Sequence, residues 1–449
     1  MNIQVLPQGR AFSFICGKER MVGMGREIFD RAREACDTRT MADVLADDCE
    51  ELLQEGIPFA ESPLASWNVL LYEAYVALGG AEPGRAARYA AACIRIGTAA
   101  GRSVSLDALK LLGIASYRQG AYDEAAGYFA QLKSHTEQDP EADIYHGNAL
   151  VRLGRVREAR PFYLDAMKLW DPDGVAARNF LRTLGGDVET GDAAADAALA
   201  KAPLLDGLEE AVPPVIPALS LSETFNLPIF INCRDRLGCL QQLVDWLLAA
   251  GYRRIFLLDN ASTYPPLLAY YEDIIQDGRV TVVHFSRNFG HRAIWLTRLL
   301  ERLDITTPYV YTDPDVLPVE DCPKGIVARL YQILRRYPFL AKVGAGLKTD
   351  DLPPTRVSMQ IAQGQAAYRQ VPVEEELYYA ACDTTFALYA PIRHYTFSPA
   401  MRTGGRLLLR HLPWYLDPQH LPEDEAYYIA HADASSTFAR DVKGPQGGA

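Results

Sequence analysis

Apolar residues follow two different periods along the chain. Up to about residue 184 they recur every three or four positions, which is typical of helices that bury one face. From residue 226 onward, short apolar runs such as LPIFINCR and RRIFLLDN are separated by segments of helical period. Residues 185–225 show neither period and are rich in Ala, Asp and Pro, and we place a linker in the second part of this segment. We therefore predict an α + α/β chain, with a helical domain at 1–201, a linker at 202–225 and an α/β domain at 226–449.

The helical half contains an internal repeat. Four pairs of similar residues stand thirty-four positions apart: Gly113 and Gly147, Gly120 and Gly154, Ala125 and Ala159, and Tyr128 and Phe162. This period favours stacked helix-turn-helix units over the alternative, a plain helical bundle. The segments LKLLGIASYRQGAYDEAAGYFAQL and YHGNALVRLGRVREARPFYLDAM resemble tetratricopeptide repeats, with Pro140 and Pro172 ending the second helix of each. The resemblance implies a protein partner or self-association through these repeats.

Composition and charge narrow the class of protein. The sequence is 49% hydrophobic and 23% charged, as expected for globular domains, and its formal charge of -12 argues against a nucleic-acid partner. The eight cysteines have no metal-ligand spacing, which favours buried thiols in a reducing compartment. No apolar run is long enough for a transmembrane segment, and the first residues lack a signal-peptide pattern. We expect a cytoplasmic protein, with peripheral association at the inner face of the membrane as an option.

Polar residues stand at the ends of four predicted strands. They are Asn232 and Arg234, Asp259 and Asn260, Arg287 and Asn288, and Asp313 and Asp315. Helices between the strands imply a largely parallel sheet, in which ligands bind beyond the carboxyl ends of the strands. One acid at a strand end is ordinarily a turn or a helix cap. Four successive strand ends instead favour a shared ligand site at one edge of the sheet.

The fourth strand end carries two acids separated by one proline. In extended chain the side chains of Asp313 and Asp315 point to the same side. Two carboxylates held 4 Å apart repel by roughly 4 kcal/mol at an effective dielectric of 20. Mn²⁺ or Mg²⁺ would relieve this repulsion, and such ions commonly share their ligands between carboxylates and substrate phosphates. The motif therefore predicts a divalent cation and a nucleotide diphosphate.

These motifs together resemble a known family. LPIFINCRDR, IFLLDNAST, RNFGHRAIW and YTDPDVLP are similar to the nucleotide-sugar half of glycosyltransferases of the GT-A fold, most of all family 2, over roughly residues 227–431. The resemblance implies a nucleotide-diphosphate sugar as donor, a UDP-sugar first of all. The nucleotide-sugar-binding residues that it implies are Asn232, Arg234, Asp259, Asn260, Asn288, His291 and Asp313. A helix cap or a core position is the alternative for His291.

The resemblance also implies a metal site and a general base. Asp313 and Asp315 would bind the metal, and His411 in RHLPWY would close its site. The base would be Asp424 in the first instance and Asp383 in the second, because an inverting transfer needs a carboxylate to take the acceptor proton. An acid-rich helix start is the alternative reading of residues 423–425.

The predicted function is metal-dependent transfer of a sugar to a glycan or glycoconjugate, in bacterial surface polysaccharide synthesis. One alternative is a nucleotidyltransferase, but this class carries a glycine-rich basic loop after the first strand, and NCRDRLGCL holds one glycine. A second alternative is a repeat scaffold with an inactive transferase domain. Against it, Asp259, Asp313 and Asp315 are all present.

Overall fold

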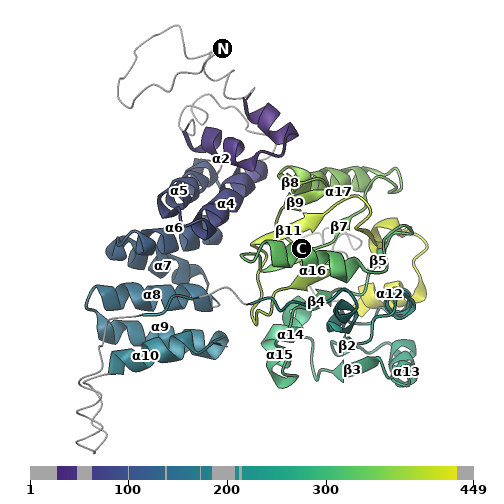
Figure 1. The fold of residues 1–449 in the computed structure, drawn as a ribbon. Helices are drawn as coiled ribbons and strands as arrows, with labels where there is room; N and C mark the ends of the chain where they lie inside the picture. Colours follow the sequence, from purple (N-terminus) through teal and green to yellow (C-terminus); the bar gives the residue numbers. More distant parts are fainter. Residues whose placement is uncertain are drawn as a thin grey trace, which may run out of the picture.

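The computed structural model describes residues 28–47, 63–99, 101–136, 139–171, 173–184, 208–211 and 215–431. A helical region comes first along the chain, and a domain built on a mixed β-sheet follows it (Figure 1). The α + α/β prediction is confirmed at this level. Pro172 and the linker residues 202–207 and 212–214 lie outside the described residues. Within the described ranges, no helix combines the length and apolar character that crossing a membrane requires.

The helical region is a column of helices in which chain neighbours pack together (Figure 1). The helices with described bounds are α2 (Thr38–Asp47), α4 (Pro63–Gly79), α5 (Pro83–Ala99), α6 (Leu106–Arg118), α7 (Tyr122–His135), α8 (Pro140–Arg152), α9 (Val156–Leu169) and α10 (Val175–Leu184). Pro140 begins α8, where its missing N–H costs no hydrogen bond, whereas the sequence suggested that it ends the preceding helix. The preceding helix α7 already ends at His135.

The thirty-four-residue period has a physical cause in helix packing. A Cβ atom on Gly113 would stand 2.6 Å from the ring of Phe129, and one on Gly147 would stand 2.6 Å from the ring of Tyr163. The same close approach between two helices is therefore made twice. Gly120 and Gly154 end the first helix of each pair with positive φ, a conformation that favours glycine.

The second domain is organised around a nine-stranded sheet with the order β3-β2-β1-β4-β10-β6-β11-β9-β8. Its strands are β1 (Ile229–Cys233), β2 (Ile255–Asp259), β3 (Val280–His284), β4 (Tyr309–Thr312), β6 (Lys342–Gly344), β8 (Pro372–Glu374), β9 (Leu377–Tyr379), β10 (Ala387–Tyr389) and β11 (Ala400–Thr403). The four strands expected from the sequence are mutually parallel, as predicted. A second sheet has the order β5-β12-β7, formed by β5 (Val316–Pro318), β12 (Leu408–His411) and β7 (Gly346–Leu347).

Helices connect and cover these strands (Figure 1). Those with described bounds are α12 (Leu237–Ala250), α13 (Pro265–Ile274), α14 (Ala293–Leu296), α15 (Leu299–Arg302), α16 (Ile326–Arg336), α17 (Arg356–Ala366) and α18 (Glu423–His431), and short 3₁₀ turns lie at Glu223–Asn226, Gly290–Arg292, Ala367–Arg369 and Leu412–Tyr415. The segment HRAIWLTRLLERL is broken into α14 and α15, although its period suggests one helix. Thr297 turns its hydroxyl back to the Ala293 carbonyl (2.7 Å) and Arg298 adopts the left-handed region, which interrupts the helix.

Aromatic side chains join the two regions. The ring of Tyr75 in α4 stacks on Phe339 with centroids 5.3 Å apart, and Tyr72 packs against Tyr379 at 5.5 Å. The Ser398 hydroxyl donates a hydrogen bond to Asp107 at the start of α6.

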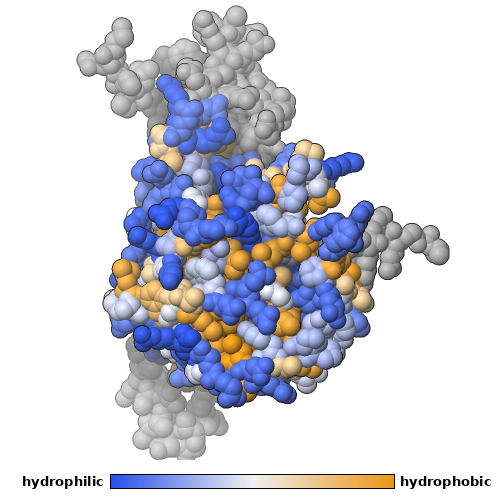
Figure 2. All heavy atoms as spheres, turned by 90° about the vertical axis from the view of Figure 1, so that its right-hand side faces the viewer, coloured by the Kyte–Doolittle hydropathy of each residue, from blue (hydrophilic) through white to orange (hydrophobic). Residues whose placement is uncertain are grey.

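Figure 2 shows the side of the molecule seen from the right of Figure 1, where hydrophilic side chains predominate and apolar ones gather in smaller patches between them.

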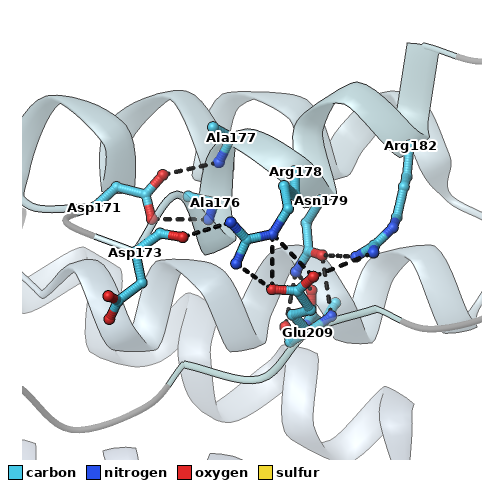
Figure 3. Close-up of polar contacts among 9 residues, drawn as sticks. Asp171, Asp173, Ala176, Ala177, Arg178, Asn179, Arg182 and Glu209 are labelled. Atoms are coloured by element: carbon cyan, nitrogen blue, oxygen red, sulfur yellow. Dashed lines mark hydrogen bonds and ion pairs between the residues drawn. The ribbon is translucent and has the colours of Figure 1, made fainter.

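The segment 208–211 lies on the last helices of the column. Glu209 forms ion pairs with Arg178 and Arg182, and its backbone N–H donates to Asn179 Oδ1 (3.0 Å) (Figure 3). Its carbonyl accepts hydrogen bonds from Asn148 Nδ2 (2.9 Å) and Asn179 Nδ2 (2.8 Å). The chain is thus fixed to the helical region at this point, before it reaches the sheet.

Candidate functional site

The site begins at the carboxyl ends of β1, β2 and β4. Ile231 of β1 pairs with Thr312 of β4, so Asn232 and Asp313 are the next residues on neighbouring strands. On the other side of β1, Cys233 pairs with Asp259 of β2. Neighbouring strands lie about 4.8 Å apart, so the ends of β2 and β4 are separated by about 10 Å. Parallel pairing therefore brings three of the predicted strand ends to one edge of the sheet.

Asp315 is the centre of a buried charge network. Its carboxylate forms an ion pair with Arg236, and Arg236 Nη2 is 2.8 Å from Glu425 Oε2 of α18. His411 Nε2 lies 3.5 Å from Asp315 Oδ2. Burial raises the pKa of Asp315, but the positive charges of His411 and Arg236 outweigh this effect and hold the pKa below its usual range. Asp315 is therefore the ionised member of the acid pair.

Asp313 differs from Asp315 in its surroundings. Burial and the neighbouring charge of Asp315 raise the pKa of Asp313 above its usual range. The Thr384 hydroxyl donates to Asp313 Oδ2 (2.7 Å), and the backbone N–H of Thr384 donates to Asp383 Oδ1 (2.9 Å). Thr384 thus joins Asp313 to Asp383, which is solvent-exposed.

Asp383 also has an aromatic partner. The Tyr395 hydroxyl donates to Asp383 Oδ1 (3.0 Å), and the Tyr395 ring lies 5.2 Å from the ring of His291 between centroids. His291 follows Gly290 in the loop after β3, and its carbonyl accepts a hydrogen bond from Tyr311 (2.9 Å). The structure therefore brings His291 and Asp383 to neighbouring positions.

Asp259 and Asn260 build the loops around the second strand end. Asp259 accepts a hydrogen bond from the backbone N–H of Ser262 (2.9 Å), and its Oδ2 lies 2.8 Å from His284 Nδ1. Asn260 bonds the loop after β3 twice, accepting from Phe289 N–H (2.8 Å) and donating to the Gly290 carbonyl (3.0 Å). Both residues therefore shape the edge of the site through local hydrogen bonds.

Asn232 and Asn288 both form hydrogen bonds with the backbone of Gly290. Asn232 Nδ2 donates to the Gly290 carbonyl (3.3 Å), and Gly290 N–H donates to Asn288 Oδ1 (2.8 Å). Asn232 Oδ1 is buried, and no described residue donates a hydrogen bond to it. A buried acceptor costs stability unless some group donates a hydrogen bond to it.

Asp424 and Arg234 are two further residues predicted for the site. Asp424 is 8% exposed and accepts a hydrogen bond from Gly238 N–H (2.7 Å) in the first turn of α12, where a carboxylate favours the helix dipole. Arg234 extends beyond β1, with Nε 3.6 Å from Asp235 Oδ2. Asp235 in turn accepts from the backbone N–H groups of Thr263 (2.6 Å) and Tyr264 (2.8 Å), which ties the loop after β1 to the loop after β2.

A buried lysine lies beneath Asp383. Lys342 of β6 has no exposed surface, and its Nζ donates to the Asp383 carbonyl (3.3 Å) and to the Tyr389 hydroxyl (3.0 Å). The ammonium also lies 4.7 Å from the centroid of the Tyr389 ring. Burial lowers the pKa of Lys342 to about 8. Lys342 therefore supports the loop that carries Asp383.

The acid pair suits a cation that shares its ligands with a substrate. Asp315 Oδ1 is buried without a hydrogen-bond donor among the described residues, and burial together with the neighbouring charge of Asp315 raises the pKa of Asp313. Arg236 already neutralises one side of Asp315. In the described part of the chain, no three His, Cys, Asp or Glu side chains are placed together to hold a metal by themselves. These residues fit the binding mode in which one or two carboxylates and substrate phosphates complete the coordination.

The sequence analysis missed several members of this network. Arg236, Glu425, Thr384, Tyr395 and Lys342 were not among the predicted site residues. Arg236 stands three positions after the first strand, and Glu425 stands beside the predicted Asp424. Both could have been suggested by their closeness in sequence to predicted site residues. No signal in the sequence linked Arg236 to Glu425 across 189 residues, nor placed Lys342 beneath Asp383.

Comparison with known proteins gives no close relative. No protein-family model and no curated protein matches the sequence. Among solved structures, the chain is similar to a single-residue variant of the Thermobaculum terrenum O-GlcNAc transferase, with a TM-score of 0.27 and 17% identity over 54% of this chain and 45% of that one. It is also similar to a mannosyltransferase from Pyrobaculum calidifontis in complex with GDP-Man and Mn²⁺, with a TM-score of 0.29 and 16% identity over 45% of this chain and 60% of that one. The matched region spans only about half of each neighbour, and likenesses of this size do not establish a shared fold.

Proposed function

We propose that this protein is a glycosyltransferase of the GT-A type, which moves a sugar from a nucleotide diphosphate to a glycan or glycoconjugate. The observation that carries the proposal is the position of the partly buried Asp313 and the buried Asp315, just past the end of β4 and at the same sheet edge as the ends of β1 and β2. Paired acids at the carboxyl edge of a parallel sheet suit a nucleotide ligand with a divalent ion. Asn232 Oδ1 and Asp315 Oδ1, two buried acceptor atoms to which no described residue donates, also lie at this edge.

The donor would lie across the ends of β1, β2 and β4. Asn232, Asp259 and Asp313 would contact the nucleoside, and the loop of Asn288, Gly290 and His291 would cover the sugar. Mn²⁺ or Mg²⁺ would be held by Asp313 and Asp315, with His411 beside them, and would supply charge stabilisation for the departing nucleotide. Arg234 directly follows the end of β1 and would contact the diphosphate.

The general base is better assigned to Asp383 than to Asp424. Asp383 is exposed, lies one residue from Thr384, which bonds Asp313, and is oriented by the Tyr395 hydroxyl. The Asp424 carboxylate instead accepts a hydrogen bond from Gly238 N–H at the start of α12. In an inverting transfer, Asp383 would take the proton of the acceptor hydroxyl as the bond to the sugar forms. Tyr395 is a positioning residue in this scheme.

The helical region would recruit the acceptor or a protein partner, in line with its likeness to tetratricopeptide repeats. Its packing contacts with the sheet domain through Tyr75 and Phe339 keep the two close enough to act on one substrate. A function in bacterial surface polysaccharide synthesis would fit such recruitment.

Calorimetric titration of the purified chain with UDP-sugars and GDP-sugars, with and without Mn²⁺, tests the proposal. We expect metal-dependent binding that is lost in Asp313→Asn, an isosteric change at the acid pair. The matched control is Asp321→Asn, because Asp321 is an exposed acid on the same domain. Thermal unfolding of both variants checks that the fold is retained.

The products separate this function from its alternatives. Glycosyl transfer releases a nucleoside diphosphate, whereas a nucleotidyltransferase releases pyrophosphate from a nucleoside triphosphate. A scaffold with an inactive domain would bind no nucleotide sugar, with or without Mn²⁺. If Asp313→Asn bound the nucleotide sugar as tightly as the unaltered protein, the acid pair would no longer support the proposal.

A further inference from the structure

A cavity lies where the helical region meets the sheet domain, between the end of α9 and the helices α14 and α15. In Figure 1 these helices face each other across the lower part of the molecule. The charged residues that line the cavity are Lys168, Arg292, Arg298, Arg393 and Glu301. The cavity is distinct from the acid pair at the end of β4, since neither Asp313 nor Asp315 lines it.

The lining is positive although the protein as a whole is negative. Four cationic side chains surround one carboxylate, in a chain of formal charge -12. Glu301 pairs only loosely with Arg298, with Oε1 and Nε 3.6 Å apart. These cations create a local positive potential in a recess of a protein whose net charge is negative. Such a potential favours an anionic ligand.

Two adjacent residues of the same lining each carry a buried side-chain nitrogen. Arg393 Nε and His394 Nδ1 are buried, and no described residue forms a hydrogen bond with either. The Arg393 guanidinium is held in place by the ring of Trp170 at 4.2 Å and by a hydrogen bond from Nη2 to the Ile305 carbonyl (3.4 Å). A fixed guanidinium with a free Nε–H is prepared for one more oxygen acceptor.

The cavity continues toward the proposed general base. Tyr395 lines it, and the Tyr395 hydroxyl donates to Asp383 Oδ1 (3.0 Å). The Arg292 guanidinium lies 5.6 Å from the centre of the Tyr395 ring. A molecule with one end in the cavity would therefore pass over Tyr395 before it reaches Asp383.

We propose that this cavity binds an acidic group, a phosphate or a carboxylate, of the sugar acceptor. The acid is held by Arg393, Arg298 and Arg292, and the rest of the acceptor lies over Tyr395 with its hydroxyl near Asp383. The substrate class is thus an anionic glycan or a phosphate-bearing glycoconjugate. The acceptor role rests on the proposed glycosyl transfer, whereas the binding of an anion does not.

Binding is measured first, by tryptophan fluorescence, because Trp295 lines the cavity and Trp170 contacts Arg393. The probes are inorganic phosphate, D-glucuronate and D-glucose at constant ionic strength. We expect a saturable response to phosphate and glucuronate and none to glucose. Arg298→Gln and Arg393→Gln should each raise Kd about tenfold or more, as expected for losing a charged hydrogen bond.

Two more variants keep the test independent of damage to the fold. Arg302→Gln removes an exposed cation of α15 that does not line the cavity, and it should leave Kd unchanged. Glu301→Gln removes the single carboxylate of the lining and should lower Kd. Equal Kd values in Arg298→Gln, Glu301→Gln and the unaltered protein would overturn the assignment of the site, as would an equal response to glucose.

Transfer assays then test the acceptor role. With acidic acceptors, Arg298→Gln should raise KM without changing kcat, and with neutral acceptors it should change neither. Inorganic phosphate that binds but does not compete with an acidic acceptor would overturn the acceptor role. Loss of anion binding beside intact, Asp313-dependent donor binding rejects this inference alone. Intact anion binding without any donor binding rejects the glycosyl transfer and leaves the anion site.

Discussion

The guanidinium of Arg236 is in ion-pair contact with the carboxylate of Asp315, and the same guanidinium reaches Glu425 on the last described helix. All three side chains are nearly inaccessible to solvent. The contact links the loop after β1 to the end of β4 and to α18, which is far away in the chain. A buried charge network of this kind fixes the relative position of three elements at the proposed site.

We predict that Arg236→Met is strongly destabilising. The change leaves the carboxylates of Asp315 and Glu425 buried without their common cation, and such a loss costs about 3–5 kcal/mol. Urea denaturation measures the free energy of unfolding. The double variant Arg236→Met with Glu425→Leu should be less destabilised than the sum of the two single variants, because the second change removes one of the unpaired charges.

The exposed pair of Arg406 and Asp321 supplies the control. Arg406→Met should cost under about 1 kcal/mol, as is typical of solvent-exposed ion pairs. If Arg236→Met cost no more than Arg406→Met, the buried network would not organise the site.

The repeated close approach of helices in the first region gives a second prediction. In Gly113→Ala the new methyl group would stand 2.6 Å from the Phe129 ring, and in Gly147→Ala 2.6 Å from the Tyr163 ring. Overpacking of this kind typically costs about 1–3 kcal/mol. Urea denaturation followed by far-ultraviolet circular dichroism should show both variants shifted to lower midpoints.

Gly127 is the matched control because it lies inside α7 and a Cβ there meets no atom within 4 Å. Gly127→Ala should stabilise the protein by about 0.5–1 kcal/mol, since alanine loses less backbone entropy in a helix. A similar loss of stability in all three variants would mean that the ring contacts are not the cause of the thirty-four-residue spacing.

The spacing of these glycines shows which parts of the fold were predictable. Gly113 and Gly147 recur at one period because each lets a ring pack against a helix, and this constraint is written locally in the chain. The same is true of the apolar runs of β1 to β4, whose parallel order follows from the helices between them. Asn232, Asp259 and Asp313 could be expected at one edge for this reason.

Other features depend on contacts between residues far apart in the chain. β10 enters the sheet between β4 and β6 and runs antiparallel to both, which no local period indicates. Lys342 looks like an ordinary polar start of a strand, yet its ammonium is enclosed by the Tyr389 and Tyr395 rings. Asp424 and Glu425 look alike in sequence, but one bonds the start of α12 and the other bonds Arg236. Tertiary packing decides these roles.

The buried Lys342 predicts how the stability of the protein depends on pH. Burial lowers its pKa from 10.5 to about 8 in the folded protein. Below pH 8 both folded and unfolded chains carry the proton, and folding includes the cost of burying the charge. Between pH 8 and 10.5 the folded chain has lost the proton while the unfolded chain still binds it, so this residue's contribution to stability rises with pH.

Comparison with Lys342→Met isolates this contribution, since methionine has a similar length and no charge. The stability of the unaltered protein minus that of the variant should rise by up to about 3 kcal/mol across this window. Urea denaturation at several pH values measures the difference, and the exposed Lys324→Met serves as the control. A difference that stays flat or falls with pH would contradict the effect of burial on Lys342.

The last prediction separates the two carboxylates considered for the general base. Asp383→Asn should lower kcat by about 10²–10⁴-fold, because a general base of this kind contributes that factor, while donor affinity in calorimetry stays the same. Tyr395→Phe should lower kcat less, since it removes only the hydrogen bond that orients Asp383. Asp424→Asn should reduce stability with kcat kept, because this carboxylate caps α12, and Asp350→Asn controls for loss of an exposed acid. The reverse pattern, a large loss of kcat in a stable Asp424→Asn and none in Asp383→Asn, would move the base to α18.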